Sequence, residues 1–179
     1  MSSMRHTSIF YKLICVVLCA AMLVPLTACG ETRKSQREVY AMDTIMTLTA
    51  YGNNADAGLD AAESIILSMD SALDPELSTS TTYAINHAQG GSTVISGQIA
   101  RMISTAHTVY QQSEGALDLT LYPLVKRWGF VDGKYYVPTA AEISEDLSRL
   151  CFGQIVLTSF PASGSYSVSL PSYGELSFA

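Results

Sequence analysis

The stretch from residue 115 to residue 130 constrains the chain most, because it sets one acidic residue among apolar neighbours. It reads Gly-Ala-Leu-Asp-Leu-Thr-Leu-Tyr-Pro-Leu-Val-Lys-Arg-Trp-Gly-Phe and contains the only Trp of the chain. A buried acid is costly unless its oxygens accept hydrogen bonds or face a charge, so Asp118 requires a specific partner. Thr120 would share a face with it in an extended segment, which Pro123 would end. On residue types alone, the stretch fits a buried loop with a capping Asp as well as it fits a binding site.

This stretch resembles a signature of FAD:protein FMN transferases, the ApbE-like lipoproteins. The agreeing positions are Gly115, Ala116, Asp118, Thr120, Pro123, Leu124, Val125, Trp128, Gly129 and Phe130. Residues 41–44, Ala-Met-Asp-Thr, are similar to a second motif of that family, more often Met-Gly-Thr, whose Met contacts the flavin nucleotide. The resemblance implies a flavin-binding set made of Met42, Ala116, Leu117, Asp118 and Thr120. On chemistry alone, Met42 could equally be a core side chain that fills a gap.

The resemblance implies an enzyme that transfers FMN from FAD to a Thr hydroxyl of an acceptor protein and releases AMP. FAD would be the substrate, and Mg²⁺ would shield the pyrophosphate. The resemblance covers residues 39–179 but only about the first half of the family's length, so most Mg²⁺ ligands are expected outside this chain. No metal ligand and no catalytic residue are assigned within it. The alternative is a truncated, non-catalytic flavin-binding lipoprotein.

Residues 76–91 are rich in Ser, Thr and Gly and predict a loop. They resemble a family segment in which an aromatic residue follows Leu-Ser-Thr and stacks near the flavin. Here Ser80 takes that position, and Tyr83 lies three residues beyond it. Either Tyr83 serves as the aromatic contact or the contact is missing.

The first 28 residues predict a lipoprotein signal peptide. Arg5 and Lys12 precede an apolar run over residues 13–26, which is shorter than the roughly 20 residues that span a bilayer. The order Leu-Thr-Ala-Cys that ends at Cys29 resembles a bacterial lipobox. It implies that Cys29 is acylated, for example with palmitate, and that the protein is anchored on the extracytoplasmic face of a bacterial cell membrane. An ordinary signal peptide with an incidental Cys is the alternative.

Charge and cysteine content exclude several other classes of protein. The formal net charge is −6, and no basic run follows Arg37, so a nucleic-acid partner is not expected. Cys151 is the one cysteine downstream of Cys29, so the mature chain would have no internal disulfide and no Cys pair for zinc.

Hydrophobic patterning predicts an α+β domain. The resemblance implies that its helices pack on a mixed or antiparallel sheet. The resemblance implies a flavin-transferase fold related to the T-fold and incomplete at its C-terminal end. Residues 29–38 are predicted to be a tether, and residues 39–179 the N-terminal part of the domain. Strands are expected over 39–51, buried on both faces, and over 153–158, 166–170 and 174–179. Helices are expected over 55–73, from the cap Ser96 to near Gly115 at the C′ position, and over 139–150. Thr139 and Glu142 would open the last helix with a capping box. The last strand is apolar, and an open edge there is expected to promote association.

Overall fold

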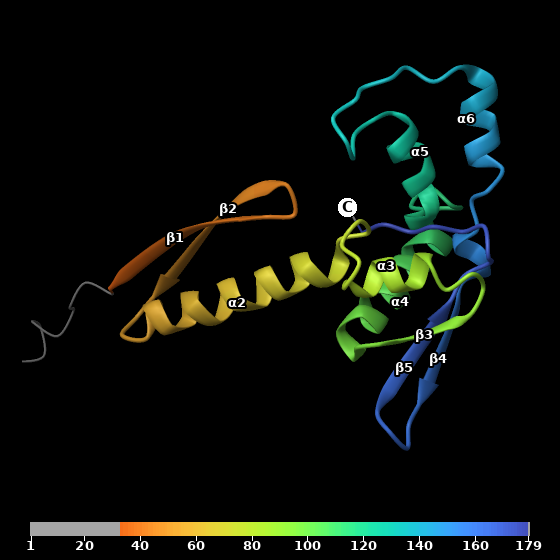
Figure 1. Ribbon diagram of the computed structural model, residues 1–179. Coiled ribbons are helices and arrows are strands. Elements are labelled where there is room, and N and C mark those ends of the chain that lie inside the picture. The colour runs from red at the N-terminus through yellow and green to blue at the C-terminus, as the bar shows by residue number, and fades with distance from the viewer. Residues whose placement is uncertain (1–32, 179) are drawn as a thin grey trace, which may run out of the picture. The chain divides into compact units, whose positions relative to one another are not determined.

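A computed structural model describes residues 33–178 (Figure 1). The predicted signal peptide and Cys29 lie outside the described residues. Within residues 33–178, no helix is long and apolar enough to cross a bilayer. The described residues form two compact units, one of residues 33–38 with 47–61 and the other of residues 39–46 with 62–178. The predicted α+β class is confirmed, because helices accompany a two-stranded sheet and an antiparallel three-stranded sheet.

The first two strands form a hairpin. Strand β1 spans Lys34–Ala41 and strand β2 spans Thr44–Tyr51, joined by a turn at Met42 and Asp43. The prediction of a single strand over 39–51 is therefore wrong. The apolar alternation continues on both sides of the turn, and Met-Asp lacks the Asn-Gly signal of a tight hairpin, so the sequence pattern concealed the reversal. Strand β1 also begins inside the segment that was expected to be a tether.

Three helix predictions are confirmed, with differences at the helix ends. Helix α2 spans Ala55–Leu73, and helix α4 (Gly97–Gln112) begins at the cap Ser96, whose side chain accepts a hydrogen bond from the Ile99 N–H. The capping box of Thr139 and Glu142 opens helix α6 (Ala140–Leu147), which ends three residues earlier than expected.

The C-terminus of α4 corrects one detail of the sequence analysis. Ser113 is the C-cap, so Glu114 occupies the C′ position in the left-handed region at φ 54°. Gly115 follows it at C″, and its N–H donates to the Tyr110 carbonyl at 2.8 Å, which is the long bond of a Schellman motif. The glycine was assigned to C′ because glycine is the usual residue there.

The three-stranded sheet has the order β3-β5-β4. Its strands are β3 (Ser92–Ile95), β4 (Val156–Phe160) and β5 (Ser165–Ser169). The predicted second and third strands correspond to β4 and β5, although a 3₁₀ helix, η3 (Phe152–Gln154), replaces the start of the former. The sequence analysis missed β3 and the short helix α3 (Thr81–Asn86), which lies in the segment predicted as a loop.

The strand predicted over 174–179 is wrong for the described residues, because residues 174–178 are not in a sheet. The side-chain amide of Asn86 binds both backbone groups of Leu176 at 2.9 Å, and the Ser177 N–H donates to the Leu119 carbonyl at 2.9 Å. A side chain thus takes the place of a strand partner. Leu176 is fully buried, so this segment does not present the open edge that was expected.

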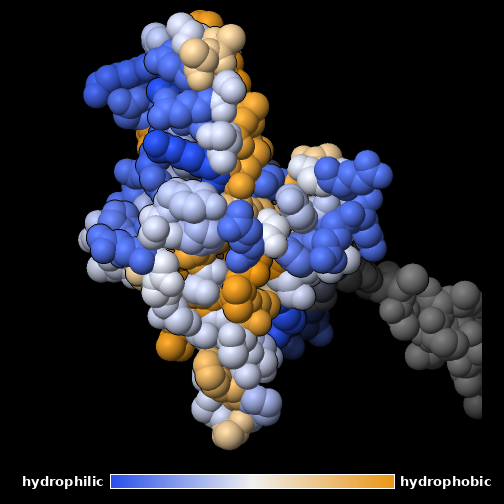
Figure 2. Space-filling view, turned by 90° about the vertical axis from the view of Figure 1, so that its right-hand side faces the viewer, coloured by the Kyte–Doolittle hydropathy of each residue, from blue (hydrophilic) through white to orange (hydrophobic). Residues whose placement is uncertain are grey.

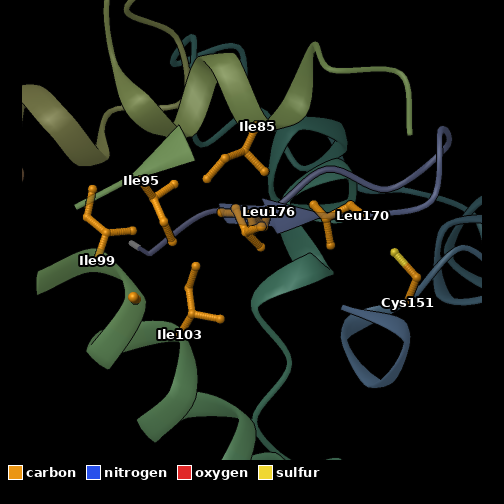
Figure 3. Close-up of a cluster of buried hydrophobic side chains, with 9 residues drawn as sticks. Ile85, Ile95, Ile99, Ile103, Cys151, Leu170 and Leu176 are labelled. Carbon is orange, nitrogen blue, oxygen red and sulfur yellow. The ribbon is translucent and has the colours of Figure 1, made fainter. Parts of the chain in front are cut away.

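The core lies where α3, α4 and the inner face of the three-stranded sheet meet. Figure 3 shows aliphatic side chains from these elements pointing toward one another. Its members are Ile85, Ile95, Ile99, Ala100, Ile103, Cys151, Val168, Leu170 and Leu176. Alternation along β5 places Val168 in the core and its serine neighbours on the other face. This core supports the signature stretch that follows α4.

Candidate functional site

After Gly115, the signature stretch continues with two exposed residues, Ala116 and Leu117. Leu117 keeps 37% of its surface exposed. The chain then enters a 3₁₀ helix, η2 (Leu119–Leu121), for which Asp118 is the N-cap. The extended segment that was expected therefore lasts only as far as Asp118, at φ −133° and ψ 114°. A ligand could reach this exposed pair.

Asp118 and Thr120 form a polar link in the interior. Asp118 Oδ1 accepts from the Thr120 N–H at 2.7 Å and from its hydroxyl at 2.5 Å. Thr120 Oγ1 in turn accepts from the Cys151 N–H at 2.9 Å. Since Thr120 is only 2% exposed, these bonds satisfy polar groups that would otherwise be costly to bury. The hydrogen-bond partner of Asp118 is therefore Thr120. The observed contacts are those of a capping Asp, one of the two interpretations that the sequence left open.

A short helix, α5 (Tyr122–Arg127), continues the stretch with Pro123 in its first turn, where a missing N–H costs nothing. Proline therefore starts a helix here and does not end a strand. The Tyr122 hydroxyl donates to the Glu76 carboxylate, and burial together with this carboxylate raises the pKa of Tyr122 above its usual range. Lys126 lies 4.9 Å from the Tyr122 ring centre and pairs with Glu175. The buried phenol is thus neutral and serves as a donor.

The Trp-Gly-Phe end of the signature is a second Schellman motif. Gly129 has φ 77°, and the Phe130 N–H donates to the Val125 carbonyl at 3.4 Å. A Cβ at Gly129 would lie 2.1 Å from the Lys134 carbonyl oxygen, so only glycine fits. Phe130 beyond it is 63% exposed and lies 5.9 Å, centre to centre, from the Tyr135 ring.

Arg127 joins the signature to α6. Its guanidinium donates to both carboxylate oxygens of Asp146, one of them at 2.8 Å. The hydrogen bonds from Arg127 hold the pKa of Asp146 below its ordinary value, although burial acts in the opposite direction. The pair fixes α5 against α6 and leaves the exposed aromatic side chains beside it. Figure 2 shows hydrophobic surface next to strongly hydrophilic groups on one face of the molecule.

Met42 lies at the tip of the first hairpin, 42% exposed. It is not a core side chain, so the gap-filling alternative does not hold. Its N–H donates to Asp70 of α2 at 2.7 Å, and it is tied to that helix rather than to residues 116–120. The structure therefore brings Asp118 and Thr120 together and leaves Met42 at a separate exposed position.

Tyr83, the candidate for the aromatic flavin contact, and Ser80, which takes the usual aromatic position, both contact neighbouring groups in the structure. Ser80 is buried and caps α3 by accepting from the Tyr83 N–H at 2.9 Å. Tyr83 stacks on His87 with ring centres 3.7 Å apart. The sequence analysis missed Glu76, Asp70 and Asn86, which make long-range polar contacts. In the sequence each is only a polar residue near apolar ones. That pattern does not distinguish a long-range contact from an ordinary surface position.

The described residues do not fit a magnesium site. Residues 33–178 contain no group of three or more His, Cys, Asp or Glu side chains that could hold a metal ion. A polar hollow of about 500 Å³ is present, and none of the predicted flavin residues lines it. Its lining is Asn86, Ser148, Arg149, Ser172, Tyr173 and Glu175.

Comparison with solved structures defines the class of fold. The chain is similar to the ApbE protein of Thermotoga maritima MSB8, with a TM-score of 0.72 and 16% identity over 81% of this chain and 47% of that one. It is also similar to the apo form of Pseudomonas stutzeri flavinyl transferase ApbE, with a TM-score of 0.68 and 20% identity over 85% of this chain and 49% of that one. The chain therefore spans about half the length of these two relatives. No curated protein matches it.

The order of helices and strands is that of an α+β flavin-transferase domain, as the sequence analysis predicted. The model of the ApbE family matches residues 42–174, more than half of the chain. The chain belongs to the ApbE family. The matched range contains Met42 and the whole signature stretch, so both motifs that suggested the resemblance lie within it.

Proposed function

We propose that this chain is the N-terminal part of a transferase that moves FMN from FAD to a Thr hydroxyl of an acceptor protein. The family match over residues 42–174 carries the proposal. A solved relative with this fold is described as a flavinyl transferase, and the same activity is proposed here. Because the chain spans about half of that relative, the complete reaction is assigned to the complete fold.

In the proposed reaction, the acceptor hydroxyl oxygen forms a bond to the phosphorus of the FMN half of FAD. The phosphoanhydride bond to AMP breaks, and AMP leaves with the bonding electron pair. The hydroxyl proton passes to a base, and no residue of the described range 33–178 is assigned that role. Positioning and charge stabilisation supply most of the catalysis of such a transfer. Mg²⁺ would stabilise the pyrophosphate charge, with ligands from outside the described residues.

The contribution proposed for this chain is flavin binding. Ala116 and Leu117 offer exposed apolar surface, and Met42 offers a second exposed apolar side chain. Asp118 and Thr120 hold the backbone of the first surface by their mutual hydrogen bonds. One Asp118 oxygen, Oδ1, makes those two bonds, which leaves Oδ2 to accept a bond from a ligand. This division separates residues that touch the flavin from residues that position it.

We also propose that Cys29 is acylated and anchors the protein on the extracytoplasmic face of a bacterial cell membrane. The Leu-Thr-Ala-Cys order behind an apolar run supports this proposal. The acceptor protein would then be exposed to the same compartment.

The test combines the complete protein that contains this chain with FAD, Mg²⁺ and acceptor proteins from the extracytoplasmic fraction, with flavin fluorescence on a denaturing gel as the readout. A fluorescent acceptor band establishes transfer. Binding of FAD without a band supports the alternative, a non-catalytic flavin-binding lipoprotein. A chain that neither binds FAD nor labels a protein contradicts both.

Two variants separate flavin binding from folding. Leu117→Ala removes an exposed side chain, so the melting temperature should stay the same while FAD affinity falls. Leu147→Ala on α6 is the matched control, since Leu147 is 46% exposed and lies outside the proposed surface. An equal FAD affinity for the two variants would contradict the placement of the flavin at Leu117.

A further inference from the structure

The turn between β1 and β2 is conformationally demanding. Both of its central residues, Met42 and Asp43, have positive φ angles, 52° and 53°. Two-residue hairpins of this kind favour Asn-Gly, because glycine has no Cβ and asparagine tolerates positive φ better than most residues do. Positive φ angles at residues other than glycine persist only where contacts with the surrounding structure stabilise them. The contacts of this turn therefore identify what stabilises it.

One contact comes from a distant part of the chain. Asp70, near the C-terminal end of α2, accepts a hydrogen bond from the Met42 N–H at 2.7 Å. This acceptor is 28 residues away in sequence. Hydrogen bonds to an ionised carboxylate are stronger than those between neutral groups. A weaker local contact, from the Tyr40 hydroxyl to Asp43 Oδ1 at 3.4 Å, lies on the other side of the turn.

The side chain that this turn presents is apolar and points away from the core. Ala41, directly before the turn, is 2% exposed, whereas Met42 is 42% exposed. The end of β1 is therefore anchored, and the next residue projects from it. An exposed, flexible and polarisable side chain suits contact with a ligand better than it suits solvation. The backbone bond to Asp70 sets the direction in which this side chain leaves the strand.

We infer that Asp70 is a positioning residue, whose carboxylate holds the left-handed turn and so presents Met42 to the flavin nucleotide. That Met42 contacts a flavin nucleotide rests on the proposed function. That Asp70 stabilises the turn does not depend on it. Asp70 itself touches no substrate in this arrangement. It acts on binding through the Met42 backbone.

Amide hydrogen exchange of the whole chain tests the hold on the turn. In Asp70→Ala, the Met42 N–H should exchange about tenfold faster or more, since a bond to a charged acceptor is lost. Asp70→Asn keeps an acceptor oxygen and should show a smaller increase. Asp60→Ala is the control, because Asp60 lies on the same helix but pairs with Arg37. Exchange of Met42 that is equally slow in Asp70→Ala and in the wild-type chain would overturn the inference.

FAD titration tests the link to binding. Asp70→Ala should weaken FAD affinity with little change in melting temperature, and Asp43→Gly added to it should restore part of the affinity, because glycine adopts positive φ at no steric cost. A merely structural Asp70 would lower the melting temperature and leave the affinity unchanged, which overturns the positioning role. If the wild-type chain binds no FAD, the proposed function fails, while the exchange result still decides whether Asp70 holds the turn.

Discussion

The hydroxyl of Thr120 is predicted to be the most costly polar atom to remove from the signature stretch. Thr120→Val keeps the shape of the side chain and deletes the oxygen that accepts from Cys151 and donates to Asp118. The Cys151 N–H would then be buried without a partner, because Cys151 is 2% exposed. Leaving such a donor unsatisfied costs about 1–3 kcal/mol. With a urea dependence of about 1–3 kcal/mol per molar, the unfolding midpoint should fall by roughly 1 M.

Urea unfolding followed by circular dichroism measures this loss, with Thr120→Ser as the control. Serine keeps the hydroxyl and removes one methyl group, so it should cost about 0.8 kcal/mol. The reasoning fails if the valine variant unfolds at the wild-type midpoint, or if the serine variant is the less stable of the two. FAD titration of the same variants shows whether Thr120 affects binding beyond its effect on folding.

Three further outcomes are expected. Arg127→Ala should make the free energy of unfolding depend less on pH in the acid range, because Arg127 lowers the pKa of Asp146 in the folded state. An Asp with a lowered folded pKa stabilises the fold above its unfolded pKa, and this stability is lost as the pH falls through the folded pKa. Urea midpoints at pH 7 and pH 3 check this, and an unchanged difference between them contradicts it. Gly129→Ala should lower the melting temperature by several degrees or more, since a Cβ would lie 2.1 Å from the Lys134 carbonyl oxygen. Cys29→Ser should release the protein from membranes after a salt wash, and a variant that stays bound would disprove the lipobox.

Local signals in the sequence predicted the three helices α2, α4 and α6. Ser96, Thr139 and Glu142 act through bonds that close within one turn, so a few neighbouring residues determine them. The stripe of apolar residues in α2 is also a local signal. The fold class followed from the same patterns, with the family resemblance.

The errors arose where a distant partner decides the conformation. Residues 174–178 are apolar and suit a strand, but Asn86 binds the backbone of Leu176 from 90 residues away. The turn at Met42 and Asp43 lacks the Asn-Gly pair of a tight hairpin, and its tertiary bond comes from Asp70. For Asp118, the sequence showed that a partner was needed and left its identity open. Thr120 lies two residues away in sequence, yet only the geometry of η2 brings both of its donors onto one oxygen of Asp118.

The reactivity of the buried Cys151 thiol can report local unfolding of the structure around it. It is the one free cysteine among residues 33–178, and burial raises its pKa, so its nucleophilic thiolate is scarce in the folded state. The sulfur also lies so close to Gly174 that a Cβ there would be 2.5 Å from it. An alkylating reagent can therefore reach this sulfur only after the packing around it has separated. When reclosing is faster than alkylation, the labelling rate reports the population of open molecules. A time course of Cys151 alkylation, followed by mass spectrometry, therefore measures the local stability around the signature stretch.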